Sequence, residues 1–203
     1  MSPAPLPITL LTPADYRRVP WKNGLGLTTE IAVEESPDGS RFVWRVSIAD
    51  VAAPGPFSAF PGYDRLIAVV EGTGMRLAVD GAAPVECRRP SPAFAFPGEA
   101  AVDCTLLDGP IRDFNLMLDR ATAAGVLTLL GGGPGRAATC EASGDVILVH
   151  ALAGSVTVVP DGQAAVAVPQ GHSALLRGAA ATTAATVAVP DGAEAVCAEV
   201  RRR

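Results

Sequence analysis

Apolar and polar residues alternate along short stretches of this chain, and turn-forming residues separate the stretches. Trp44, Val46 and Ile48, for example, alternate with Arg45 and Ser47. A period of two places neighbouring side chains on opposite faces of a β-strand, whereas the longer period of a helix is scarce here. The pattern therefore predicts an all-β protein. The expected strands are 27–35, 42–51, 65–71, 75–79 and 112–119, followed by 145–151, 155–159 and 164–168.

Two stretches repeat the same order of signals. Residues 69–81 and 151–162 each read as a strand, a glycine turn, a second strand, an Asp-Gly hairpin and the start of a further strand. We therefore expect two similar β units in tandem. The run Gly131-Gly132-Gly133-Pro134-Gly135 between them has the composition of a linker, and it sets the expected division into residues 1–125 and 126–203.

Composition argues against several classes of partner. The 203 residues are 49% hydrophobic, enough to bury a core, and the formal net charge is −5. Such a chain lacks the basic surface that binds nucleic acid or anionic lipid, and the basic run 201–203 is interpreted as a solvated tail. No apolar stretch is long enough to cross a bilayer, and residues 1–7 lack the features of a signal peptide. We expect a soluble, cytoplasmic protein.

The two halves of the chain differ in chemistry. Residues 16–120 contain both Trp, both Tyr and all six Phe, together with most of the charged residues. Residues 136–203 are mostly Ala, Val, Gly and Thr, which offer few groups able to bind or catalyse. We therefore expect the function in the first half and a supporting role for the second.

Metal and nucleophile chemistry have little support. The only histidines, His150 and His172, have no acidic residue between them except Asp161, so a histidine-ligated metal centre or a Ser-His triad is not expected. The four cysteines occur singly and are interpreted as buried thiols, although a disulfide between Cys87 and Cys104 is an alternative. No cofactor fingerprint is present, and we expect neither metal nor cofactor.

Charged residues on the expected strands are the main candidates for binding. On strand 27–35, Thr28, Glu30 and Ala32 are expected to share one face. On strand 65–71, Arg65 and Glu71 fall on the same face by the same alternation.

Buried arginines would need an anionic partner. If the polar faces point into one barrel, its interior charges must pair with one another or with a ligand, because isolated buried charge is costly. Arg45 and Arg65 would then suit a carboxylate, and Asp113 and Asn115 lie on the polar face of a later strand. A set of surface ion pairs is the alternative. The aromatic loop 56–65 is interpreted as a lid or as a plug at the end of the barrel.

Six motifs occur in order between residues 16 and 120. They are Pro20-Trp21-Lys22-Asn23-Gly24-x-Gly26-x-Thr28-x-Glu30-Ile31, Trp44-Arg45-x-Ser47, Gly55-Pro56-Phe57-Ser58-x-Phe60-Pro61-Gly62-x-Asp64-Arg65, Leu66 through Glu71-Gly72-x-Gly74, Phe96-x-Gly98-Glu99 and Asp113-Phe114-Asn115-Leu116-Met117. In these motifs the chain closely resembles the HutD family, which also includes the Ves proteins. The second half resembles the family only in length and β-rich character.

The resemblance implies a bicupin fold, with two small cupin-like antiparallel β-barrels in one chain. It also implies a small-ligand-binding regulator associated with histidine utilisation, and it carries no established reaction. The first half has no histidine for a metal-binding cupin site, so the resemblance implies binding without metal. The pocket residues that it implies are Lys22, Asn23, Glu30, Arg45, Ser47, Phe57, Arg65, Glu71 and Asn115.

The sequence is therefore compatible with three functional hypotheses. The first is a binding module for a small anionic carboxylate such as urocanate or a formylated glutamate. The second is a metal-independent isomerase or hydrolase acting on a related compound, with Glu30 or Glu71 as general base. The third is a regulator that binds a protein partner or a second copy of itself as a homodimer.

Overall fold

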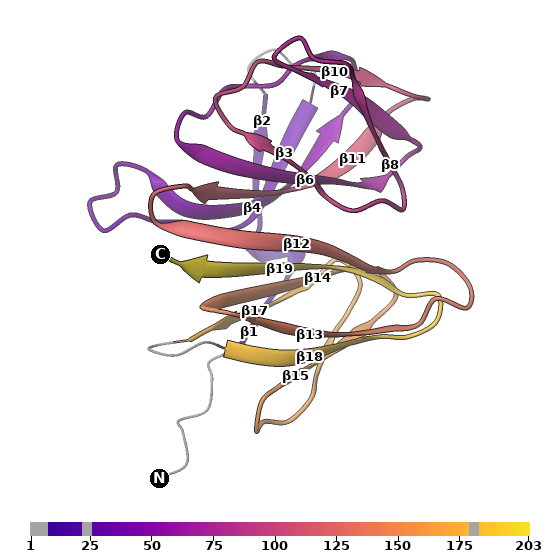
Figure 1. Cartoon of the computed structure of the whole chain (residues 1–203). Helices are drawn as coiled ribbons and strands as arrows, with labels where there is room; N and C mark the ends of the chain where they lie inside the picture. The colour runs from indigo at the N-terminus through magenta and orange to yellow at the C-terminus, as the bar shows by residue number, and fades with distance from the viewer. Residues whose placement is uncertain (1–7, 22–25, 179–182) are drawn as a thin grey trace. The chain divides into compact units, whose positions relative to one another are not determined.

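The computed structural model describes residues 8–21, 26–178 and 183–203. The chain is all-β and divides into two compact units (Figure 1). The N-terminal unit comprises Tyr16–Ala124, and the C-terminal unit comprises Gly125–Arg202 together with the segment up to Asp15. Among the described residues the helical structure is one turn of 3-10 helix, η1 (Pro13–Asp15), and no helix there is long and apolar enough to cross a membrane.

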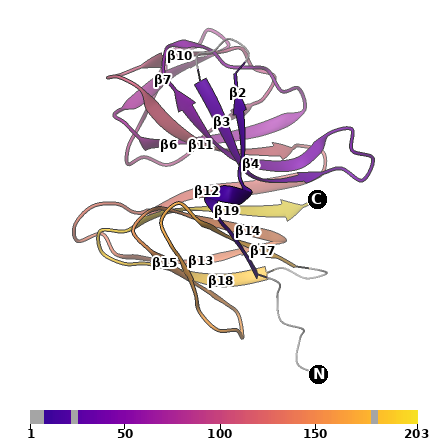
Figure 2. The same ribbon diagram turned by 180° about the vertical axis from the view of Figure 1, so that it is seen from behind.

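Two antiparallel sheets build the N-terminal unit. Figure 2 shows β2 and β3 at one edge of the larger sheet, next to β4. The larger sheet has the order β2 (Arg17–Pro20), β3 (Gly26–Glu35), β4 (Phe42–Val51), β11 (Ile111–Asp119), β6 (Tyr63–Glu71) and β9 (Phe94–Pro97). The smaller sheet has the order β5 (Gly55–Pro56), β10 (Val102–Leu106), β7 (Gly74–Val79) and β8 (Val85–Arg88).

The C-terminal unit is built in the same way. Its larger sheet has the order β1 (Ile8–Leu11), β17 (Ser173–Arg177), β14 (Val146–Ala153), β19 (Glu194–Arg202) and β12 (Ala123–Gly131). Its smaller sheet has the order β13 (Ala138–Gly144), β18 (Thr183–Val189), β15 (Val156–Pro160) and β16 (Val166–Val168).

The two units repeat one strand order. The order β4-β11-β6-β9 in the first corresponds to β12-β19-β14-β17 in the second, and β5-β10-β7-β8 corresponds to β13-β18-β15-β16. The all-β, cupin-like fold in two similar units expected from the sequence is confirmed, although the described strands form two separate sheets in each unit rather than closed barrels.

The structure differs from the expected division at the N-terminus. Strand β1 pairs with β17, and Ile8 packs against the core of the C-terminal unit. Burial of this apolar side chain attaches the segment to the second unit rather than to the first.

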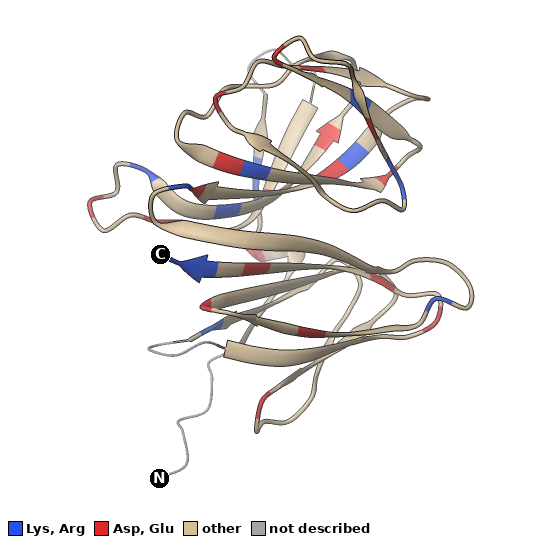
Figure 3. Ribbon diagram, viewed as in Figure 1, with Lys and Arg blue, Asp and Glu red and all other residues tan. Residues whose placement is uncertain are grey.

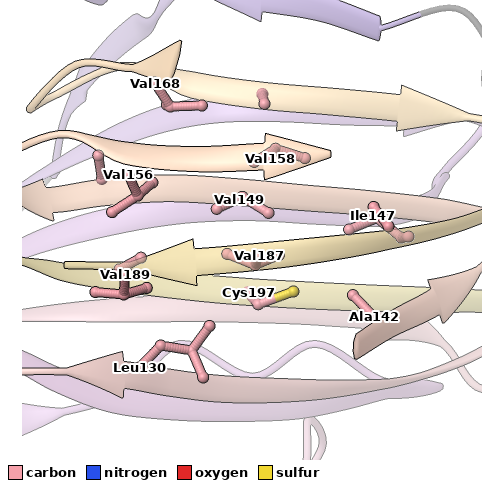
Figure 4. Packing of buried hydrophobic residues seen from close by; sticks show 14 of the residues in the cluster. Leu130, Ala142, Ile147, Val149, Val156, Val158, Val168, Val187, Val189 and Cys197 are labelled. Carbon is pink, nitrogen blue, oxygen red and sulfur yellow. The ribbon is translucent and has the colours of Figure 1, made fainter. Parts of the chain in front are cut away.

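The interior of the C-terminal unit is filled by aliphatic side chains (Figure 4). Val149 of β14, Val187 of β18 and Cys197 of β19 are all fully buried in this cluster. The cluster of the N-terminal unit likewise joins both sheets, with Ile67 of β6 packed in the same group as Leu77 of β7. All four cysteines are free thiols. The possible disulfide between Cys87 and Cys104 is therefore not formed.

Candidate functional site

A cavity of about 580 Å³ opens in the N-terminal unit. Strands β2, β3, β4, β6 and β11 and the aromatic loop after β5 contribute to its lining. Figure 3 shows basic and acidic residues along strands of this unit, including β6. Six of the residues expected from the sequence line the cavity together: Glu30, Arg45, Ser47, Phe57, Arg65 and Asn115.

Strand register explains why these side chains meet. Glu30 of β3 and Asn115 of β11 both lie opposite Ser47 of β4, so the three form one row across the sheet. In the next row, Arg45 and Arg65 lie on either side of Met117. Residues two apart on a strand share a face, so both rows point to the same side of the sheet.

Arg65 is held in place by contacts on its faces and its edge. Its guanidinium lies over the rings of Phe96, Phe57 and Phe60, at 4.9, 5.2 and 5.7 Å from their centroids. One Nη donates to the Ser58 carbonyl at 3.3 Å, and the other donates to Asn115 Oδ1 at 3.1 Å. The residue is 8% exposed, and burial lowers its pKa to about 10 although the Asp113 charge opposes the shift.

Arg45 is less completely buried and makes few polar contacts. Its guanidinium lies 5.0 Å from the centroid of the Phe42 ring and 5.2 Å from that of Phe60, and an Nη donates to Met117 Sδ at 3.0 Å. Burial lowers its pKa, partly offset by the charge of Glu30. The Nε atoms of Arg45 and Arg65 have no hydrogen-bond partner among the described residues.

Glu30 already has a partner at the rim of the cavity. Arg17 of β2 forms two hydrogen bonds with its carboxylate, at 3.1 and 3.2 Å, while the Arg17 side chain is 71% exposed. Beside this pair, Trp21 Nε1 donates to Thr28 Oγ1 at 2.8 Å. The charge of Glu30 is therefore neutralised by an arginine that reaches in from solvent.

Single-residue bulges change the faces expected from strict alternation. In β3 the register shifts between Glu30 and Ala32, so Ala32 lies opposite Val46. The expectation that Ala32 shares the face of Glu30 is therefore wrong. In β6 the register shifts at Val70.

The structure does not bring Glu71 to the cavity. Because of the extra residue in β6, Glu71 lies with Arg112, whose Nη is 3.5 Å from its carboxylate, and Arg112 also pairs with Asp50 at 2.8 Å. Its side chain is 65% exposed. The expected placement of Glu71 beside Arg65 is thus corrected, while Lys22 and Asn23 lie outside the described residues.

The resemblance-based set omitted Asp113 and Arg17, and both line the cavity. Asp113 is 1% exposed, and the amide of Asn115 donates to its Oδ1. Burial raises the pKa of Asp113 to about 7, against the effects of Arg65 and of the Asn115 hydrogen bond. The alternation of strand 112–119 already placed Asp113 on the polar face, so the sequence did carry a signal for it. Among the residues that the structure describes, no group of three His, Cys, Asp or Glu side chains is arranged to hold a metal ion.

The fold of the chain is cupin-like. The chain superposes on a cupin 2 conserved barrel domain protein from Leptotrichia buccalis with a TM-score of 0.53, at 12% identity, over 88% of this chain and 89% of that chain. At this identity the likeness shows the fold alone.

The chain belongs to the HutD family, whose model matches residues 13–196. It is 52% identical over 110 residues to an uncharacterised 21.2 kDa protein in the hutC 3′ region of Pseudomonas putida. That match covers 54% of this chain and 57% of the relative, so little more than half of the relative's length is matched. The relative's name is what links this family to the histidine-utilisation locus.

Two solved structures match over nearly the whole chain. HutD from Pseudomonas fluorescens SBW25, solved in a formate condition, has a TM-score of 0.80 at 32% identity. The match covers 97% of this chain and 100% of that chain. A conserved protein of unknown function from Pseudomonas aeruginosa PAO1 has a TM-score of 0.83 at 37% identity, covering 96% of this chain and 99% of that chain. The resemblance inferred from the motifs is confirmed.

Proposed function

We propose that the N-terminal unit binds a small anionic metabolite through a carboxylate group, without a metal ion, and that this binding regulates histidine utilisation. The observation that carries the proposal is the state of Arg45 and Arg65. Both line the cavity, neither forms an ion pair among the described residues, and the Nε of each lacks a hydrogen-bond partner there.

The energetic argument starts from the cost of burying charge. A guanidinium removed from water loses hydration, and a nearby anion offsets that loss only if it forms hydrogen bonds with good geometry. A ligand carboxylate entering the cavity supplies such an anion, and the planar guanidinium suits it through paired hydrogen bonds. The aromatic rings around Arg65 restrict the guanidinium plane, which reduces the entropy lost on binding.

The choice of metabolite rests on the family. Urocanate and formylated glutamates both carry carboxylates, and membership of the HutD family supports a compound of histidine breakdown. A cavity of about 580 Å³ accommodates molecules of this size.

Calorimetry against the histidine-pathway intermediates tests the proposal. At least one is expected to bind with a dissociation constant well below the millimolar range, and Arg65→Gln is expected to weaken binding by about tenfold or more, equivalent to about 1.4 kcal/mol. Arg112→Gln is the matched control, because Arg112 lies on the same sheet but pairs with Asp50 and Glu71. The proposal fails if no intermediate binds below the millimolar range, or if both variants behave alike.

A metal-independent isomerase or hydrolase is the second candidate, and Glu30 in the cavity lining is the observation that favours it. As general base it would first have to be released from Arg17, which occupies its carboxylate. Incubation with each intermediate followed by mass spectrometry tests this candidate, with Glu30→Gln as the comparison. Turnover that is equal in both proteins would exclude Glu30 as the base.

A further inference from the structure

We propose that Asp113 is the specificity-determining residue of the cavity, and that it selects carboxylate ligands that also carry an N–H group. The assignment rests on the proposed function, because it concerns the second end of a ligand whose carboxylate is held by Arg45 and Arg65. It adds a residue to the site that the family motifs did not single out for binding.

One hydrogen bond to the buried carboxylate of Asp113 is present among the described residues. Its partner among the described residues is the side-chain amide of Asn115, which donates to Oδ1. Asp113 forms no ion pair with any of the described residues. A carboxylate can accept about four hydrogen bonds, and a buried one that lacks them is costly. The cavity next to it is where a further donor can enter.

The side-chain amide of Asn115 bridges Arg65 and Asp113. Arg65 donates to Asn115 Oδ1 at 3.1 Å, and the opposite end of the same amide donates to Asp113. The amide thus links the cation to the anion through two hydrogen bonds. Arg65 can still donate to a ligand, and Asp113 can still accept from one. The cavity therefore presents donors from its arginines and an acceptor from Asp113, and the complementary ligand carries an acceptor and a donor.

This arrangement separates ligand classes. Above about pH 7, where Asp113 is ionised, a second carboxylate beside it would place two like charges together, and an ether or ester oxygen there would leave the acceptor unsatisfied. An amide, pyrrole or imidazole N–H supplies the missing donor. A site built to accept such a hydrogen bond discriminates strongly against an analogue that lacks it. The nearby rings of Phe57 and Phe60 favour a flat group.

Matched probes isolate the N–H group. Indole-3-carboxylate and benzofuran-3-carboxylate have the same shape and carboxylate, and differ in an N–H or an oxygen at one ring position; pyrrole-3-carboxylate and furan-3-carboxylate form a smaller pair. In titrations of the full chain at pH 8, where Asp113 is ionised, the N–H member of a pair is expected to bind at least about tenfold more tightly. The N–H proton of the bound indole is expected to shift downfield in NMR spectra, which is a readout that needs no variant.

Asp113→Asn tests the residue itself, because its amide can donate to the ring oxygen. The preference for N–H is expected to fall to about twofold or to reverse, whereas the control Asp103→Asn, on an exposed position of β10, is expected to keep it. Asp113→Ser replaces this variant if circular dichroism shows that Asp113→Asn is unfolded.

The outcomes distinguish the two proposals. Equal binding of both members of a pair, with loss of both in Arg65→Gln, overturns the role of Asp113 and leaves the carboxylate site in place. A preference for N–H that survives in both Asp113 variants also overturns that role. If neither pair nor any pathway intermediate binds, both proposals fail.

Discussion

Arg45 and Arg65 lie on the two strands that flank β11, each in register with Met117. Antiparallel pairing thus places two positive charges on the same face of the sheet, with a methionine between them. Burial lowers the pKa values of both arginines, and the charge of Arg45 lowers the pKa of Arg65 further. A cavity lined by two like charges in this arrangement is suited to an anion.

The first prediction concerns the stability of the ligand-free protein. Arg45→Met removes a partly buried charge that has no ion pair among the described residues, and it replaces the guanidinium with a flexible apolar side chain. We expect the free energy of unfolding to stay the same or rise by about 1–2 kcal/mol, while carboxylate binding weakens. Urea denaturation and calorimetry measure the two effects. A clear loss of stability would show that Arg45 is a structural residue.

The second prediction concerns pH. Because the folded-state pKa of Asp113 is raised to about 7, the folded protein holds a proton that the unfolded chain has released above about pH 4. This contribution to stability is present below the unfolded pKa and is lost as the pH rises through about 7. Each pKa unit corresponds to about 1.4 kcal/mol, so the loss can reach about 4 kcal/mol.

Denaturation of the wild type and of Asp113→Asn at pH 5 and pH 8 isolates this effect. The difference in the free energy of unfolding between the two proteins is expected to shift in favour of the variant at the higher pH. A difference that does not change between these conditions would contradict the raised pKa of Asp113.

The third prediction concerns the backbone that carries the aromatic loop. A Cβ on Gly98 would lie 2.4 Å from the Phe60 carbonyl oxygen and 2.9 Å from that of Tyr63, and both are backbone atoms. Gly98→Ala is therefore expected to destabilise the unit by about 1–3 kcal/mol and to weaken ligand binding, because Phe60 lines the cavity. Gly55→Ala is the control, since nothing lies within 4 Å of a Cβ there.

The fourth prediction compares two glutamates. Glu71→Gln is expected to leave ligand affinity within about twofold, because its carboxylate pairs with Arg112 away from the cavity. Glu30→Gln is expected to change affinity several-fold, since it releases Arg17 at the rim and adds positive charge to the cavity. Equal effects of the two substitutions would contradict the placement of Glu71.

Much of the fold could be predicted from the sequence, because each strand carries its own alternation. Arg45 and Ser47, or Asp113 and Asn115, were placed on common faces from spacing alone, and the structure brings all four to one cavity. The repeated Asp-Gly hairpins likewise indicated two similar units, and the strand orders repeat.

The positions that could not be predicted are those where alternation breaks. Val70 is an ordinary strand residue, and nothing in its type indicates the bulge that displaces Glu71. The partner of Glu30 was also hidden, because Arg17 comes from an edge strand whose pairing with β3 is a long-range property. Pairing of β1 with β17 is a contact of the same kind.

The bulge at Val70 means that the charge of the cavity depends on the register of a strand as well as on its residues. Without the bulge, Val70 would lie opposite Arg112 and Glu71 would turn to the face of Arg65, adding a further carboxylate to a cavity that Glu30 and Asp113 already line. Gain or loss of this bulge is thus a route by which relatives of this protein could change the charge of the cavity without substituting any residue that lines it.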